Sequence, residues 1–185
     1  GTADEKAGRF VADALFVTVT NVNFDDATIM DWIRRALAEK DRLAALTGGF
    51  PDESGAAAWK PSGEGDFMDK AVKVGILSTS DEDVRSLRSL LLFGLKGISA
   101  YAHHAAVLGF EDADIFTFVM EALASTTKNL TVDEMVAMVL RAGDTAVKTM
   151  ALLDRANRET YGEPGITTVK PGVGKNPGIL ISGHD

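Results

Sequence analysis

Apolar side chains recur at helical spacing along most of this 185-residue chain, and that periodicity limits the folds open to it. The first stripe consists of Ala7, Phe10, Val11, Ala14, Leu15 and Thr18. A second stripe follows Asp25 and Asp26, whose carboxylates favour a helix N-terminus, and consists of Ile29, Met30, Ile33, Ala36 and Leu37. Each stripe has the spacing of one buried helix face, which predicts two helices in this part of the chain.

The longest predicted helix begins after residue 80 and ends at Gly109. Ser80 is the predicted N-cap, with an acidic residue, Asp83, three positions further on, and glycine is typical of helix ends. The stripe of this helix consists of Leu87, Leu90, Leu91, Gly94, Leu95, Ile98 and Ala102. We expect this face to be buried.

A fourth helical block follows in two pieces. Thr131 and Glu134 have the spacing of a capping box, which predicts the start of the second piece. The first piece carries the apolar residues Ile115, Phe118, Val119, Ala122 and Leu123, and the second carries Met135, Met138, Val139, Ala146, Met150 and Leu153. The methionines, including Met30, are expected in the core. Trp32, Trp59, Phe24 and Phe93 are expected in the core or as anchors of loops.

The segment around Phe10 repeats around Phe118 at one constant offset of 108 residues. The residues shared without a gap are Phe10 and Phe118, Val11 and Val119, Ala14 and Ala122, Leu15 and Leu123, Thr18 and Thr126, Asn21 and Asn129, Asp25 and Asp133, and Met30 and Met138. The long helix precedes the second copy, and its equivalent in the first copy is expected before Gly1. We therefore predict a mainly α chain with two related three-helix-bundle units, the first one incomplete. The alternative is that two unrelated amphipathic helices share these residues only because their compositions are similar.

The chain divides into five predicted regions. Residues 1–46 are the remainder of the first helical unit, and residues 47–80 are a Gly- and Pro-rich linker with short elements. Residues 81–157 form the second helical unit, and residues 158–177 form a second linker. Residues 178–185 are predicted as the first strand and ligand loop of an α/β cluster-binding domain, because their continuous apolar run closed by Ser-Gly is typical of a buried parallel strand.

Composition excludes several classes of function. The chain has 27 acidic and 19 basic residues, a net charge of −8, which argues against nucleic acid or an anionic membrane surface as its main partner. No run of about 18 apolar residues is present, so we expect no membrane span. Cysteine is absent, which excludes disulfides, a cysteine nucleophile and a thiolate-ligated iron–sulfur cluster within these residues.

Four segments together resemble the hybrid cluster protein family, also called prismane proteins or hydroxylamine reductases. They are ALFVTVTNVNFDDA (14–27), DEDVRSLRSLLLFGLKGISAYAHHAAVLGF (81–110), EALASTTKNLTVDEMVAMV (121–139) and GVGKNPGILISGHD (172–185). The resemblance covers nearly the whole chain in the order of the family. It implies the all-helical N-terminal region of such an enzyme, followed by the first strand of its α/β domain.

The resemblance also implies cofactors and partners. The family holds a hybrid iron–sulfur–oxygen cluster of the 4Fe-2S-2O type and a second iron–sulfur cluster, whose N-terminal cysteine motif is absent here. Its SGHD histidine is a ligand of the hybrid cluster, and this histidine is His184. The glutamate and cysteine ligands are expected after Asp185. The implied enzyme is a cytoplasmic oxidoreductase of nitrogen metabolism that reduces hydroxylamine to ammonia, with nitric oxide reduction as a related activity.

Within this family, we expect the partners of the chain to be the α/β cluster domains of the same enzyme and an external electron donor, with no membrane or nucleic acid. We expect no cluster and no activity on the chain alone. The segment itself supports the ligand role, because Gly183 permits a tight bend at the strand tip and a neutral imidazole is a good iron ligand.

Two rival functions stay open from the sequence: a non-enzymatic helical interaction module and a carbon monoxide dehydrogenase-like protein. The other candidate site residues are weaker. His103 and His104 are adjacent on a helix, about 100° apart around its axis, and are not expected to chelate one ion. Asn21–Asp26 lacks the spacing of a calcium loop and is expected to cap the next helix.

Overall fold

A computed structural model describes residues 5–20, 25–49 and 55–179 of the chain. These residues form seven α-helices, one short 3₁₀ helix and no strand, so the prediction of a mainly α chain is confirmed. The elements are α1 (Glu5–Thr20), α2 (Asp26–Thr47), α3 (Gly55–Ala58), α4 (Glu64–Val74), η1 (Ile76–Ser78), α5 (Glu82–Val107), α6 (Ala113–Ser125) and α7 (Val132–Tyr161).

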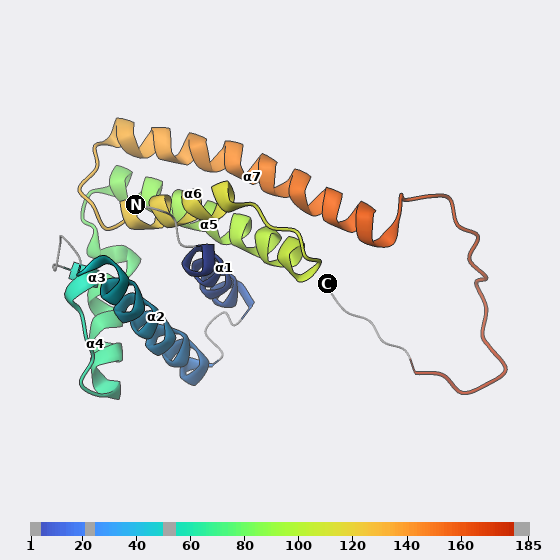
Figure 1. The fold of residues 1–185 in the computed structure, drawn as a ribbon, viewed down its shortest axis with the longest axis horizontal. Helices are drawn as coiled ribbons and strands as arrows, with labels where there is room; N and C mark the ends of the chain where they lie inside the picture. The colour runs from blue at the N-terminus through green and yellow to red at the C-terminus, as the bar shows by residue number, and fades with distance from the viewer. Residues whose placement is uncertain (1–4, 21–24, 50–54, 180–185) are drawn as a thin grey trace.

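Helix α5 is the centre of the fold, and it packs against α7, α1 and α6 (Figure 1). Leu95 on α5 and Val119 on α6 are completely buried at the centre of the core. Burying side chains of this size contributes roughly 1.5–3 kcal/mol each, so these contacts carry much of the stability of the bundle. Helices α2 and α4 lie to one side of it (Figure 1).

Helix α1 can approach α6 closely because position 8 is glycine. A Cβ atom at Gly8 would lie 2.7 Å from Cβ of Phe116, which is closer than two carbon atoms pack. Phe116 is itself only 3% exposed and has little room to move. The crossing of α1 over α6 therefore depends on the missing side chain.

Most of the predicted helix ends are confirmed. Asp25 caps α2 by accepting a hydrogen bond from the Thr28 N–H at 3.0 Å, and Gly109, with a φ of 85°, follows the end of α5. Thr131 and Glu134 form a complete capping box at the start of α7. The predicted cap of α5 was wrong by one residue. Asp81, not Ser80, accepts the hydrogen bond from the Val84 N–H, because a carboxylate at this position reaches the first free N–H groups.

Each copy of the repeat forms two successive helices, α1 and α2 in the first copy and α6 and α7 in the second. Phe118 is buried, whereas its equivalent Phe10 is half-buried and packs against Trp32 with their ring centroids 5.6 Å apart. Neither phenylalanine lies on the open surface. The division of the chain into two units remains a prediction.

Five of the expected core positions are wrong. Two of them are small residues, Ala36 and Gly94, which are exposed, and three are large. Leu90 is 57% exposed, Phe93 is 65% exposed and Met150 is 47% exposed. These three large residues lie on sides of α5 and α7 that no other described helix covers. Helical spacing identifies apolar stripes, but it does not say which of two stripes on one helix meets a partner.

The C-terminal part of the described chain leaves the bundle. Helix α7 continues to Tyr161, so the first four residues of the predicted linker 158–177 are helical. Residues 162–179 then run away from the helices as an extended segment without regular structure (Figure 1). Most of the strand predicted in residues 178–185 lies outside the described residues.

Candidate functional site

His184, the predicted cluster ligand, lies outside the described residues, as do Asp185 and most of the Asn21–Asp26 segment. The described chain ends at Ile179, whose side chain is 92% exposed. The role of His184 therefore rests on the SGHD resemblance.

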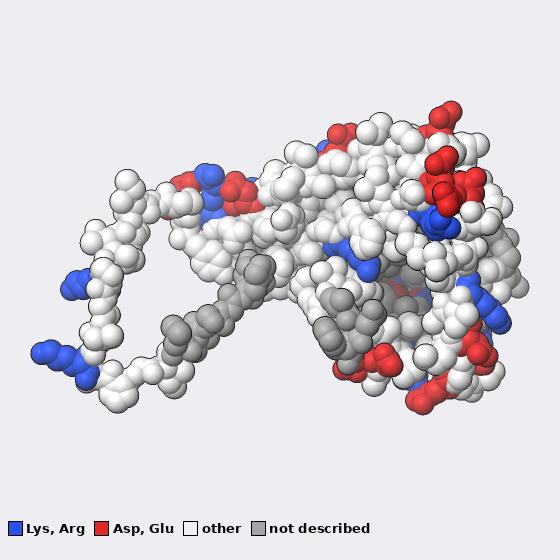
Figure 2. Space-filling view, turned by 180° about the vertical axis from the view of Figure 1, so that it is seen from behind, with Lys and Arg blue, Asp and Glu red and all other residues white. Residues whose placement is uncertain are grey.

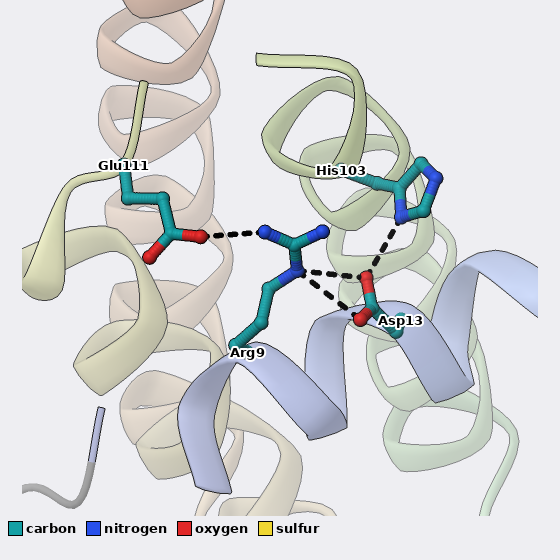
Figure 3. Close-up of polar contacts among 4 residues, drawn as sticks. All are labelled: Arg9, Asp13, His103 and Glu111. Carbon is teal, nitrogen blue, oxygen red and sulfur yellow. Dashed lines mark hydrogen bonds and ion pairs between the residues drawn. The ribbon is translucent and has the colours of Figure 1, made fainter. Parts of the chain in front are cut away.

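A polar network joins α1, α5 and the loop after α5 (Figure 3). We call it the α1–α5 polar network; it consists of Arg9, Asp13, His103 and Glu111. Arg9 Nε donates to both carboxylate oxygens of Asp13, at 3.0 and 3.1 Å, and Arg9 Nη1 donates to Glu111 Oε1 at 2.5 Å. His103 Nδ1 lies 2.7 Å from Asp13 Oδ1. The side chains of Arg9, Asp13 and His103 are only 25–28% exposed.

Local sequence explains half of this network. Arg9 and Asp13 are four residues apart on α1, so they share a helix face and form an ion pair. Glu111 follows Gly109, whose left-handed backbone turns the chain back toward α1. His103 reaches Asp13 only because α1 crosses α5. Nothing in the sequence indicated this contact except the charged pair Arg9 and Asp13 on an otherwise apolar helix.

Phe16 fixes the position of His103 from a second side. The two rings stack with their centroids 4.6 Å apart and their planes inclined by 27°, while His104 meets the edge of Phe16 at 5.3 Å. The imidazole is thus held by a carboxylate on one side and an aromatic ring on the other. Such an arrangement fixes helix packing, and no hydroxyl or thiol nucleophile hydrogen-bonds to this imidazole among the described residues.

The described residues do not by themselves fit an iron–sulfur cluster. The chain has no cysteine, and within residues 5–20, 25–49 and 55–179 no three histidine or acidic side chains converge on one point as metal ligands. His103 and His104 do not join such a group. The thiolates of a cluster would therefore have to come from other residues than these.

The clear pKa shifts belong to groups at helix ends and between helices. Hydrogen bonds from Thr28 lower the pKa of Asp25 at the start of α2. The backbone N–H and hydroxyl of Thr131 lower the pKa of Glu134 in the capping box. The Arg141 guanidinium, with two contacts of 2.8 Å, lowers the pKa of Glu121 and ties α7 to α6. These carboxylates stabilise the fold.

No helix in the described part of the chain is long and apolar enough to cross a membrane.

Comparison with known proteins identifies the family. The family model described as Prismane/CO dehydrogenase family matches residues 1–185. The chain is 54% identical to the hydroxylamine reductase of Chlorobaculum tepidum, 52% identical to that of Desulfosudis oleivorans and 54% identical to that of Nitratidesulfovibrio vulgaris. Each match covers 100% of this chain and 34–35% of the relative, so the chain spans about a third of the length of these proteins. The chain therefore belongs to the Prismane/CO dehydrogenase family.

Proposed function

We propose that this chain is the helical part of a hydroxylamine reductase of the hybrid cluster type. The observation that carries the proposal is the match to curated hydroxylamine reductases at about half identity along the whole chain. The reaction joins one hydroxylamine with two electrons and two protons to give ammonia and water. Because this reaction consumes electrons, the enzyme requires an external electron donor, and a reducing compartment such as the cytoplasm suits its thiolate ligands. Nitric oxide reduction is a related activity of the same centre.

The redox centres would be the hybrid 4Fe-2S-2O cluster and a second iron–sulfur cluster. Their thiolates lie outside this chain, which has no cysteine. We assign one ligand of the hybrid cluster to His184, on the strength of the SGHD segment. The described helices hold no cluster ligands in this proposal, and their part in the enzyme is structural.

A broad apolar surface on α5 and α7 supports this structural part. We call it the α5–α7 apolar face; its large exposed side chains are Leu90, Phe93 and Tyr101 on α5 and Val136, Leu140, Val147 and Met150 on α7. Helices α5 and α7 pack along one another, and a Cβ atom at Gly94 would lie 3.9 Å from Cβ of Ala142. Figure 2, which shows the molecule from behind, shows mostly uncharged residues across the middle of its surface.

The stripe on α7 is free of charge over four turns. Val136, Leu140, Gly143, Val147 and Met150 follow one another at helical spacing, and none is polar. Soluble monomers rarely leave apolar patches of this extent uncovered. About two thirds of each relative lies outside the match, so we propose that the remainder of the enzyme, its α/β cluster domains, covers the α5–α7 apolar face.

Replacing the matched third of the Chlorobaculum tepidum enzyme by this chain tests the function. The chimera should consume hydroxylamine with a reduced viologen as donor and should show the electron paramagnetic resonance signal of the hybrid cluster. A chimera that is folded and loaded with cluster yet reduces no hydroxylamine would overturn the proposal.

His184→Ala in the same chimera tests the ligand. We expect the hybrid-cluster signal to change or vanish and reductase activity to fall by at least about tenfold. Even the loss of a residue that only supports a metal ligand lowers metal affinity or activity by about 10–100-fold. His104→Ala is the matched control and should leave both unchanged. An unaltered signal with full activity in the His184→Ala protein would show that this histidine is not a ligand.

The two rival functions make different predictions. A carbon monoxide dehydrogenase-like protein would oxidise carbon monoxide in the same chimera assay, whereas the names of the relatives favour hydroxylamine. A non-enzymatic interaction module would need no cluster domains. Charged substitutions on the α5–α7 apolar face, such as Leu140→Lys with Val147→Lys, would then leave the activity of the chimera intact, whereas we expect them to disrupt its assembly.

A further inference from the structure

A basic pocket lies at the end of the bundle where α4, η1, the start of α5 and the turn between α6 and α7 meet. Its volume is about 490 Å³, which is within the range of small-molecule sites. None of the residues of the α1–α5 polar network lines it. The pocket is therefore a separate feature of the molecule.

The charge of this pocket is opposite to that of the chain. Its lining contains three cations, Lys73, Arg85 and Arg88, and no aspartate or glutamate, although the chain has a net charge of −8. Arg85 and Arg88 are three residues apart on α5 and so share a helix face, while Lys73 comes from α4 on the other side of the pocket. Hydroxyl groups and an amide, including those of Ser78 and Asn129, complete the lining.

The charge of Arg88 is not neutralised by any described residue. Its Nη1 donates to Thr79 Oγ1 at 3.1 Å and its Nη2 donates to the carbonyl oxygen of Lys128 at 2.9 Å, and both acceptors are neutral. These bonds hold the guanidinium in place at the pocket and leave three of its five N–H donors unassigned. A half-buried cation without a counter-charge is unfavourable and favours the binding of an anion.

The other two cations are also weakly compensated. Arg85 donates to the carbonyl oxygen of Thr79 at 3.2 Å, and its carboxylate partner, Glu82, is 3.4 Å away and 86% exposed. An exposed pair of this kind contributes little. Lys73 has no hydrogen bond or ion pair to any residue in the described part of the chain.

We propose that this pocket binds a phosphate group. A tetrahedral dianion presents oxygens in several directions at once, which suits two guanidinium groups from one helix and an ammonium group from another. The volume exceeds that of inorganic phosphate, so the group can be free phosphate or the phosphate of a small monoester. This site is independent of the proposed reductase function, because its lining, among the described residues, contains neither His184 nor any residue of the α5–α7 apolar face.

Titration calorimetry of the 185-residue chain tests the site. Inorganic phosphate and ribose 5-phosphate are the two probes, with ionic strength held constant by sodium chloride. We expect saturable binding of inorganic phosphate with one site per chain. Tighter binding of ribose 5-phosphate identifies a monoester as the ligand, and equal binding identifies the phosphate group alone; either result supports the site.

Variants then locate the binding. Lys73→Gln removes a cation that makes no internal hydrogen bond, so it should weaken phosphate binding several-fold without unfolding the chain. Arg88→Gln should weaken binding at least about tenfold, with Arg88→Lys restoring part of it; circular dichroism checks that each variant is folded. Lys170→Gln, in the extended segment, is the matched control and should bind as the parent does.

Three results would overturn the proposal. The first is no saturable binding of either probe, which would indicate that the three cations pair with a carboxylate from elsewhere in the enzyme. The second is an equal heat of binding when sodium chloride replaces phosphate as the titrant, and the third is equal weakening by Lys73→Gln and Lys170→Gln.

Discussion

Helix pairs α1–α2 and α6–α7 share a sequence pattern but differ in how deeply they are buried. Val119 and Ala122 on α6 are completely buried, whereas their equivalents Val11 and Ala14 on α1 are only half-buried. Helix α7 buries six residues along α5, and α2 buries none among its described residues. The pattern is the same, so the difference comes from the neighbours that each pair has.

The neighbour in question is α5. It packs against both helices of the second pair, whereas in the described part of the first pair it packs against α1 and not along α2. In the described chain α2 contacts mainly α1, and its apolar residues Ile29, Met30 and Ile33 remain half-buried. The comparison teaches that a repeated sequence fixes which face of a helix is apolar, while its stabilising effect depends on what covers that face.

The largest effect is expected when the same side chain is removed from each copy of the repeat. Phe118→Ala should lower the free energy of unfolding by about 3–5 kcal/mol, because it empties a buried site. Phe10→Ala should cost about half as much, because Phe10 is half-buried and packs mainly on Trp32. Urea unfolding followed by circular dichroism measures both. Equal losses would show that the two copies are equally buried in solution.

Two glycines test the packing on either side of the bundle. Gly8→Ala should destabilise the chain by about 1–3 kcal/mol, because the new Cβ would overlap Phe116 and force α1 away from α6. Gly97→Ala on α5 meets nothing within 4 Å, so it should stabilise by up to about 1 kcal/mol through helix propensity. Thermal unfolding measures the two shifts, which should have opposite signs. A stable Gly8→Ala protein would contradict the close crossing.

Low pH should weaken the first turn of α2 more than the first turn of α7. This is the smallest of the expected effects. The pKa values of Asp25 and Glu134 are both lowered in the folded chain, so each carboxylate stabilises its helix above its ordinary pKa of 3.8 or 4.5. That stabilisation is lost as the pH falls through the lowered pKa. Protonation removes the negative charge of the acceptor for Thr28 at the start of α2 and so weakens these hydrogen bonds, whereas the Thr131 hydroxyl that accepts from the Glu134 N–H is uncharged throughout.

Below the ordinary pKa values, the first turn of α2 should therefore fray before that of α7. Amide chemical shifts of Thr28 and Glu134, followed from pH 5 to pH 2, measure this order. Asp25→Asn, which keeps an uncharged acceptor, is the control and should remove the pH dependence at Thr28. Simultaneous fraying of both helices in the parent chain would contradict the prediction.

Local features of the sequence determined most of the secondary structure. Helical periodicity, the Asp25 cap, the Thr131–Glu134 capping box and Gly109 each act within about one helical turn, so they can be read without knowing the fold. Two errors of this kind concern helix ends: Asp81, not Ser80, is the cap of α5, and α7 continues to Tyr161 instead of ending before residue 158. Family membership could also be predicted from the sequence, because four long segments resemble the family and occur in the same order.

Tertiary structure alone decided which apolar stripes are buried and which polar groups meet. Leu90 and Met150 have core spacing and are exposed, and Asp13 pairs with His103 from a helix distant in sequence. The basic pocket likewise joins Lys73, on α4, to Arg88, on α5. The hydrogen bonds of helices and caps are determined by residues that are neighbours in the sequence. Burial and charge pairing depend instead on the surface of another helix, and no local sequence pattern contains that information.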